Sequence, residues 1–283
     1  MASRVSSERD CEMGKEVGYT IRFDDRTCSQ TQLRYITDGI FVRQCVADPY
    51  LFRYHVVILD EAHERSLYTD ILFALVKKAV LYRKGTLKLI VTSATLNTRT
   101  FSNYYNKCPV IQMHGKLFPV EVKYYPIRQS VRIEEAVKAT IRMHLHEADG
   151  DILVFLTGSE ECEAATRLCE QKLEELMSRG REVPGMIMYQ LYGALSNEDQ
   201  ARVFEKTPEG VRKVVFCTNI AETSLTIDNI GFVIDCGFVK QKNFNPKTNM
   251  DSLVSTPISK VQAIQRKGRA GRTQEGKCLR LYS

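Results

Sequence analysis

The stretch Val56-Val57-Ile58-Leu59-Asp60-Glu61-Ala62-His63 joins a continuous apolar run to two carboxylates and an imidazole. Four apolar residues in a row fit a short strand of a parallel sheet that is covered by helices on both faces. Ligands of open parallel sheets bind outside the carboxyl ends of the strands, so the acidic pair is expected to project into such a site. The stretch therefore predicts an α/β fold with polar chemistry at a strand end.

Similar short apolar runs recur along the chain and alternate with helical patterns, as in repeated βαβ units. The further expected strands are Lys88 to Val91, Ile152 to Leu156, Gly185 to Gln190, Lys213 to Cys217 and Gly231 to Asp235. They form two groups, separated by the proline-containing segment 114–126, which has no helical pattern. We therefore predict two domains, residues 1–115 and 116–283.

Three segments between the expected strands have the apolar spacing of packing helices. One follows Thr69, which we expect to cap it, and a second runs from about Val131 to Leu145. The third begins after Ser159. The apolar faces of the first and third are expected to hold Leu72, Leu75, Val76 and Ala79, and Ala165, Leu168, Leu173 and Leu176.

Composition limits the class of protein without deciding its function. The chain has 283 residues, 43% of them hydrophobic, and a formal net charge of +6, which suits a polyanionic partner but does not require one. Apolar runs are far shorter than the ~20 residues that span a bilayer, and the N-terminus lacks an apolar signal core, so we expect no membrane and a location in the nucleus or cytoplasm. Nine scattered cysteines lack metal-ligand spacing and are expected to be reduced and mostly buried.

The acidic pair after Leu59 suits a divalent cation and a water molecule. We assign Asp60 to Mg²⁺ and Glu61 to orienting or deprotonating the attacking water. An equally common reading of two carboxylates at a strand end is that they cap the next helix. Ser93-Ala94-Thr95 follows the next strand at the same sheet edge and can hydrogen-bond to the acidic loop, although such a turn is usually only a turn.

A second candidate site lies in Gln265-Arg266-Lys267-Gly268-Arg269-Ala270-Gly271-Arg272. Ser259 and Gln262 form a capping box, so a helix should start there and place Gln265, Arg269 and Arg272 on one face. Such a face can orient water and neutralise the charge of a triphosphate. A basic run is usually a solvated surface, but two glycines inside a helix argue against that reading, because glycine costs about 1 kcal/mol there unless something approaches closely.

A hydroxyl- and amide-rich loop follows the strand that ends at Cys217. It reads Thr218-Asn219-Ile220-Ala221-Glu222-Thr223-Ser224-Leu225-Thr226-Ile227 and can contact phosphates or ribose. As a polar pattern alone, it is not specific.

In their order and spacing, these segments closely resemble the DEAH-box ATP-dependent RNA helicases of superfamily 2, the DEAH/RHA family. The resemblance covers nearly the whole chain. Besides the motifs at 60–63, 93–95, 218–227 and 265–272, it extends to Val17-Gly18-Tyr19, Arg22-Phe23-Asp24-Asp25, Thr37-Asp38-Gly39, His63-Glu64-Arg65, Leu153-Val154-Phe155-Leu156-Thr157-Gly158 and the closing segments 257–260 and 276–282.

The resemblance implies two RecA-like domains with largely parallel sheets, with ATP or another NTP and Mg²⁺ between them. Single-stranded RNA, or a duplex with an overhang, would lie across their top and be moved by cycles of hydrolysis. A domain-two hairpin, placed here at 239–253, would keep the strands apart. Glycine-patch proteins often activate such enzymes.

Motif matching also implies a role for each site residue. The catalytic positions would be Asp60, Glu61, His63, Gln265, Arg269 and Arg272. His63, Ser93 and Thr95 would couple the nucleotide and RNA sites, and Thr37, Thr218 and Asn219 would face RNA. Ser224, Thr226 and Asp228 would face the nucleotide, whose base would be held between Arg4 and Phe204.

The sequence departs from the family at the phosphate-binding loop. No G-x-x-x-x-G-K-[ST] is present, and none of the Gly-Lys pairs at 14, 115 and 276 is followed by Ser or Thr. The chain thus resembles a helicase core truncated at both ends, whose first domain lacks its N-terminal strand and loop. Such a chain is expected to be catalytically incomplete by itself, and the alternative is a non-catalytic remnant that binds RNA or protein.

Overall fold

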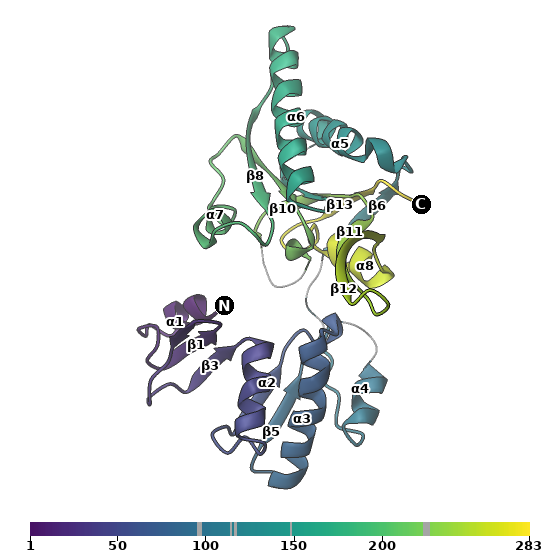
Figure 1. Cartoon of the computed structure of the whole chain (residues 1–283). Helices are drawn as coiled ribbons and strands as arrows, with labels where there is room; N and C mark the ends of the chain where they lie inside the picture. The colour runs from purple at the N-terminus through teal and green to yellow at the C-terminus, as the bar shows by residue number, and fades with distance from the viewer. Residues whose placement is uncertain (95–97, 114, 116–117, 148, 223–226) are drawn as a thin grey trace. The chain divides into compact units, whose positions relative to one another are not determined.

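The computed structural model of the protein describes residues 1–94, 98–113, 115, 118–147, 149–222 and 227–283 (Figure 1). The chain divides into two compact units, Met1–Gln112 and Met113–Ser283. Each unit has hydrophobic core residues of its own. The division falls close to the predicted boundary between residues 115 and 116.

Unit 1 combines two small sheets with helices. One sheet has the order β2-β1-β3, and the other consists of β4 and β5 paired in parallel. The elements of unit 1 are α1 Ala2–Glu8, β1 Val17–Ile21, β2 Asp24–Arg26, β3 Leu33–Ile36, α2 Asp38–Ala47, β4 Val56–Leu59, the 3₁₀ turn η1 Ala62–Glu64, α3 Leu67–Arg83, β5 Lys88–Val91 and α4 Thr98–Tyr104.

The core of unit 1 covers only one face of its β4–β5 pair. Val57 and Leu59 of β4 are buried with residues of α2 and α3. Val56 and Ile58 on the opposite face are 47% and 54% exposed. The expectation that these strands would be covered on both faces was therefore wrong for unit 1, because no helix of this unit packs on the second face of the pair in the described residues.

Unit 2 is built on a six-stranded sheet of order β6-β13-β10-β7-β9-β8, and all five strand pairs are parallel. This arrangement confirms the predicted α/β class with a largely parallel sheet. The elements are β6 Val120–Tyr124, η2 Gln129–Val131, α5 Arg132–His146, β7 Asp151–Phe155, α6 Ser159–Ser178, β8 Gly185–Leu191, α7 Asn197–Arg202, β9 Val211–Cys217, η3 Asn219–Ala221, β10 Ile230–Asp235, β11 Phe238–Asn245, β12 Met250–Pro257, α8 Lys260–Gly268 and β13 Gly276–Arg280.

Both faces of the unit 2 sheet are buried, because successive side chains of a strand point to opposite faces. Ile152 and Val154 of β7 pack in the cluster that includes α5 and α6. Leu153 and Phe155 belong to a second cluster on the opposite face. Figure 1 shows α5 and α6 side by side over the sheet. All five residues of β7 are buried, as the continuous apolar run predicts.

The expected helices are present, with one correction at the start of α3. We expected Thr69 to cap that helix. Instead Ser66 is the N-cap, and its hydroxyl oxygen accepts a hydrogen bond from the Thr69 backbone N–H at 3.1 Å. The helix begins earlier because Ser66 already supplies the acceptor that its first turn needs. The predicted capping box of Ser259 and Gln262 is confirmed at α8.

Several strands escaped prediction. β6 and β13 alternate or mix polar and apolar residues and lie at one side of the sheet, where β6 is an edge strand. Pro119 and Pro126 flank β6 rather than interrupt it, which is the place where proline is tolerated near a strand. The short strands of the β2-β1-β3 sheet also lack a continuous apolar run.

A long antiparallel hairpin extends from the carboxyl side of β10. Strands β11 and β12 pair from Phe238 with Pro257 to Asn245 with Met250. The sequence placed a hairpin at 239–253, with residues 243–246 near its turn. The observed turn falls later, between Asn245 and Met250. Most residues of both strands are exposed.

Candidate functional site

The acidic loop of unit 1 is held by the strand next to it. Asp60 and Glu61 follow the last residue of β4, and the Thr92 hydroxyl, just after β5, donates to Asp60 Oδ1. The same hydroxyl oxygen accepts from the Glu61 backbone N–H at 3.2 Å, and the Thr92 carbonyl accepts from Ala62 N–H at 2.9 Å. Glu61 has a φ of 51°, a left-handed conformation that is uncommon outside glycine and tends to concentrate at functional sites.

His63 connects the acidic loop to the Ser93-Ala94-Thr95 segment. Its Nδ1 accepts a hydrogen bond from the Ala94 backbone N–H at 3.2 Å, and its Nε2 lies 3.4 Å from Glu61 Oε2. Because Nδ1 accepts, the proton of the neutral ring is on Nε2, facing the Glu61 carboxylate. The side chain is 4% exposed. The structure thus brings together Asp60, Glu61 and His63 with the loop of Ser93.

The donor set of this loop fits a hard divalent cation. Two adjacent carboxylates, one of them hydrogen-bonded to a hydroxyl, are the oxygen ligands that Mg²⁺ accepts in phosphate-handling sites, where it keeps several water ligands. Within the described ranges, no group of three or more His, Cys, Asp and Glu side chains is arranged to hold a metal ion. A cation here would therefore rest on one or two carboxylates and on groups outside the protein.

The other unit 1 candidates lie at helix ends. Thr37 is the exposed N-cap residue of α2, and the next residue, Asp38, accepts hydrogen bonds from the hydroxyls of Ser66 and Thr69 at the start of α3. Thr37 is therefore fixed beside the start of α3, which follows the acidic loop along the chain. Arg4 lies in α1, where its Nε donates to Glu8 at 2.8 Å and its side chain is 80% exposed.

In unit 2, a buried arginine organises the candidate site. Arg266 of α8 is fully buried, and its Nε donates to Glu222 Oε1 at 2.7 Å. Its Nη1 donates to Asp235 Oδ1 at 2.8 Å, at the end of β10, and its guanidinium lies 4.8 Å from the ring centre of Phe155. Gln262 also donates to Glu222, at 3.2 Å. This ionic cluster ties α8 to the polar loop after β9 and to the sheet.

The electrostatics of the ionic cluster keep its arginine charged. Burial alone would lower the pKa of Arg266, but the carboxylates of Asp235 and Glu222 outweigh it and raise that pKa above its usual value. Removing one partner of a buried pair costs about 3–5 kcal/mol, because the remaining charge is left without compensation. Arg266 was not predicted as a site residue. The sequence does place Arg266 at helical spacing from two small apolar residues, Ala263 and Ala270, which indicates a buried face, and the structure buries all three.

The three predicted phosphate-facing residues do not share one helix face. α8 ends at Gly268, Arg269 is its C-cap residue and Arg272 lies beyond it, so that part of the prediction was wrong. Arg269 is 8% exposed, and its Nη2 donates to the Glu222 carbonyl. Gln265 and Arg272 are half-buried. The helix stops because the chain turns at Gly271 to meet the segment before β6.

The remaining candidate residues of unit 2 lie at opposite ends of the sheet's strands, some at the carboxyl ends and some at the amino ends. Thr218 and Asn219 directly follow the carboxyl end of β9, where Thr218 is buried and Asn219 exposed. Asp228 is exposed and lies two residues before β10, at the amino ends of the strands. Phe204, 42% exposed, follows Val203, whose carbonyl accepts from Lys213 Nζ near the start of β9.

Arg272 lies on the same amino side as Asp228 and Phe204. The neighbouring Gly271 carbonyl accepts from Phe118 N–H at 2.9 Å, two residues before β6 begins. Asp228, Phe204 and Arg272 thus lie at the amino ends of the strands, whereas Thr218 and Asn219, predicted to face RNA, lie at the carboxyl end of β9. Thr95, Ser224 and Thr226 were also predicted as site residues and lie outside the described residues.

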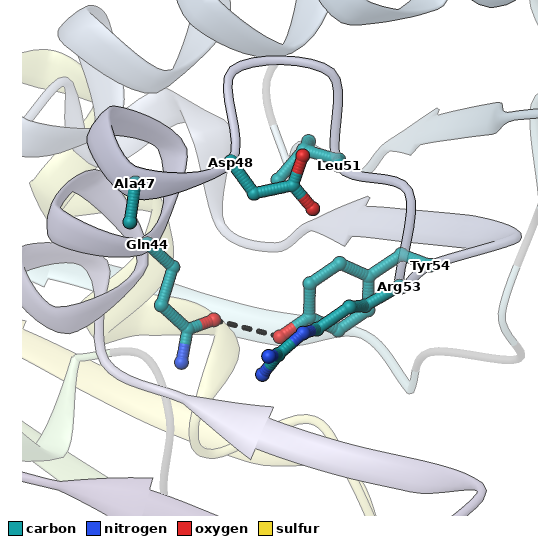
Figure 2. A pocket seen from close by; sticks show the side chains of 6 residues that line it. All are labelled: Gln44, Ala47, Asp48, Leu51, Arg53 and Tyr54. Atoms are coloured by element: carbon teal, nitrogen blue, oxygen red, sulfur yellow. Dashed lines mark hydrogen bonds between the residues drawn. The ribbon is translucent and has the colours of Figure 1, made fainter.

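A cavity of about 180 Å³ in unit 1 lies apart from these candidates. Figure 2 shows its six lining residues, with the Tyr54 hydroxyl donating to Gln44 Oε1 at 2.7 Å. They are Gln44, Ala47, Asp48, Leu51, Arg53 and Tyr54. None of them was predicted as a site residue. As for membranes, none of the helices in the described part of the chain combines the length and the apolar character needed to cross one.

Comparison with known proteins gives consistent matches. Residues 134–274 match the family model of the helicase conserved C-terminal domain. Over all 283 residues the chain is 52% identical to the Schizosaccharomyces pombe pre-mRNA-splicing factor ATP-dependent RNA helicase prp22, of which it spans 24%. Two crystal structures of Escherichia coli HrpB match all of this chain at 36% sequence identity. One is described as a DEAH/RHA helicase and has a TM-score of 0.88; this chain covers 35% of it. The other is described as a DExH-box NTPase and has a TM-score of 0.84; this chain covers 34% of it.

These matches define unit 2 as a helicase C-terminal domain with a RecA-like parallel sheet. The resemblance read from the motifs is confirmed across the chain's full length. The chain is similar over its whole length to helicases of the DEAH/RHA family. It spans about a quarter of the length of its prp22 relative and about a third of HrpB.

Proposed function

We propose that this chain is the core segment of an ATP-dependent RNA helicase that couples NTP hydrolysis to translocation on RNA and to unwinding. The observation that carries the proposal is a set of contacts in the acidic loop: the Thr92 hydroxyl hydrogen-bonds to Asp60 and to the Glu61 backbone, and His63 lies between the Glu61 carboxylate and the Ala94 N–H that it accepts from. It links a carboxylate pair suited to hydrolysis with a loop of the next strand, in a chain 52% identical to an ATP-dependent RNA helicase.

In unit 1, Asp60 would hold the magnesium ion of ATP, which when bound would reduce the repulsion between phosphates. Glu61 would orient and deprotonate the attacking water. His63, which accepts from Ala94 N–H on one side and faces Glu61 on the other, would couple the state of that carboxylate to Ser93 and Thr95. Arg4 would lie against the nucleotide base.

In unit 2, Gln265, Arg269 and Arg272 would act on the γ-phosphate, with Gln265 orienting water and the arginines stabilising developing charge. Ser224, Thr226 and Asp228 would contact the nucleotide, and Phe204 would stack on its base. Thr218 and Asn219 at the opposite sheet edge, with Thr37 of unit 1, would contact RNA. The exposed β11–β12 hairpin would keep the separated strands apart.

Binding through phosphates and sugars would make the RNA interaction salt-dependent and nearly blind to sequence. The substrate class we propose is single-stranded RNA or a duplex with an overhang. The splicing role stated in the name of the prp22 relative favours RNA processing in the nucleus, with the cytoplasm as the alternative. Glycine-patch proteins are proposed as activators of a longer form.

A second candidate function is non-catalytic binding of RNA or protein. The observation that favours it is that the sequence contains no G-x-x-x-x-G-K-[ST], whose amides and lysine hold the phosphates in related motors. On either reading the chain alone is expected to hydrolyse ATP weakly or not at all.

The test is to purify the 283-residue chain and to measure both RNA binding and Mg²⁺-dependent ATP hydrolysis, with Glu61→Gln as the matched control. We expect binding of single-stranded RNA that weakens with salt, because phosphate contacts release counterions. Turnover that rises with RNA and disappears in Glu61→Gln would show that the chain is catalytically complete. RNA binding without turnover would leave catalysis to a longer form. Failure to bind RNA would contradict the first candidate function and would leave only protein binding for the second.

A further inference from the structure

A basic groove lies between α5 and α6 of unit 2, away from every residue predicted to contact nucleotide or RNA. The two helices pack side by side on one face of the sheet (Figure 1). The groove has a volume of about 290 Å³. We call it the α5–α6 groove, and its lining residues are Lys138, Ile141, Arg142, Leu145, His146, Lys172, Glu175, Leu176, Arg179 and Arg181.

The rim of the α5–α6 groove carries an excess of positive charge. Five of its ten lining residues are Lys or Arg and one is Glu, so its formal charge is +4 with His146 neutral. Arg142, Arg179 and Arg181 are exposed. For these three, the described residues provide no carboxylate within 4.0 Å; Lys138, by contrast, pairs with Glu135 at 2.7 Å. The rim therefore offers unneutralised cations to a ligand.

The floor of the groove is apolar and aliphatic. Ile141 is 8% exposed and belongs to the core, while Leu145 and Leu176 pack partly buried against it. No Phe, Tyr or Trp side chain lines the groove. Grooves between two helices accept the apolar face of a third helix, with anchors at i, i+3 or i+4, and i+7. Aliphatic floor and cationic rim together select a helix with apolar residues on one face and acidic residues beside them.

We propose that the α5–α6 groove is a docking site for an acidic amphipathic helix of a partner protein. Charge complementarity specifies the partner, because Asp and Glu beside the apolar anchors would meet Arg142, Arg179 and Arg181 at the rim. Single-stranded nucleic acid is disfavoured as the occupant, since its bases are usually bound by stacking on several aromatic side chains, and the groove has no Phe, Tyr or Trp and a single imidazole, that of His146. The proposal does not rest on catalysis by this chain.

The test uses the full 283-residue chain and a fluorescent synthetic peptide of about 18 residues, or five helical turns, with leucines on one face and glutamates on the flanks. Fluorescence anisotropy measures its Kd for the wild-type chain and for the combined variant Arg142→Glu/Arg179→Glu/Arg181→Glu. The matched control is Lys123→Glu/Arg167→Glu/Lys206→Glu, which changes net charge equally at three exposed positions outside the groove.

We expect the groove variant to weaken peptide binding by at least about tenfold, as the loss of three rim charge pairs implies. The control should stay within about twofold, because charge at a distance is screened. A peptide whose leucines are replaced by serine should bind as weakly as the groove variant does. Circular dichroism melting confirms that each variant is folded.

Equal weakening by the two variants would overturn the proposal, because the effect would then be general charge attraction. So would binding that is unchanged when the leucines become serine, which would leave the apolar floor without a role. A parallel titration with oligouridine tests the other occupant. If the groove variant loses oligouridine binding and keeps peptide binding, the surface is an RNA contact and the proposal is wrong.

Discussion

Two glycines in the arginine-rich segment have opposite structural roles. A Cβ atom at Gly271 would lie 2.6 Å from the Phe118 carbonyl oxygen and 2.7 Å from Val120 Cγ2, whereas one at Gly268 would meet nothing within 4 Å. We expect Gly271→Ala to destabilise unit 2 by about 1–3 kcal/mol through overpacking. Gly268→Ala should stabilise it by about 0.5–1 kcal/mol, because alanine is the better helix former. Urea unfolding of both variants measures the two signs.

The same comparison separates two explanations of the glycines. If they were kept for the approach of a ligand, both substitutions would leave stability nearly unchanged and reduce binding only. A destabilising Gly268→Ala would contradict the packing explanation. The sequence correctly indicated that something approaches this segment closely, but not that the backbone before β6 does so, since that contact joins residues about 150 positions apart.

The burial of the Arg266 side chain was not predicted from the sequence. Arg266 stands among three other cations between 265 and 272 and is the one that is fully buried. Its partners, Glu222 and Asp235, are 44 and 31 positions away. The acidic residues at 60 and 61 were predictable because they directly follow a strand, so that local sequence alone places them at the sheet edge.

At the scale of elements, two effects act in opposite directions on the pKa of His144 in the last turn of α5: burial and the helix dipole. His144 in the last turn would gain from a positive charge near the helix C-terminus. Burial nevertheless dominates and lowers the pKa of His144, although its hydrogen bond to Pro184 opposes this. Nε2 donates to the Pro184 carbonyl at 3.0 Å, and among the described residues Nδ1 has no hydrogen-bond partner, so a second proton would be placed where nothing accepts it.

We therefore expect unit 2 to lose stability as the pH falls below about 6.5. The unfolded chain then binds a proton that the folded chain excludes, and the unfolded state gains; above that pH both states are neutral and the effect is absent. His144→Gln should lack this part of the pH dependence, because glutamine donates to Pro184 without titrating. Chemical denaturation at several pH values between about 5 and 8 measures the difference.

The variant His146→Gln, in the same helical turn and exposed, controls for the loss of one imidazole. Parallel profiles for wild type and His144→Gln would show that the expectation is wrong.

Which elements could be predicted follows from how they are buried. β4, β5, β7, β9 and β10 read as continuous apolar runs and were located to within two residues at their starts. β6, an edge strand, was missed because edge strands need apolar residues on fewer surfaces, and β13 was missed because its sequence mixes polar and apolar residues. The end of α8 was also missed: the helix ends at Gly268, whereas the sequence analysis extended it through Arg272.

At the scale of the whole molecule, the two units bury their sheets to different extents. The unit 2 sheet has a buried cluster on each face, whereas the unit 1 pair β4–β5 exposes Val56, Ile58 and Ile90 by about half. Leaving three such side chains half exposed forgoes on the order of 3 kcal/mol of hydrophobic stabilisation. The small size of unit 1 adds to this, because small domains bury a smaller fraction of their surface.

We therefore expect the chain to unfold in two thermal transitions, with unit 1 first. Differential scanning calorimetry of the full chain should resolve them, and a fragment of residues 113–283 should reproduce the later transition within a few degrees, because its core clusters contain residues of unit 2 alone. The reciprocal fragment, residues 1–112, should melt lower and aggregate through its exposed strand face. A single transition in the full chain, together with an unfolded 113–283 fragment, would show that the units depend on one another for stability and would contradict this expectation.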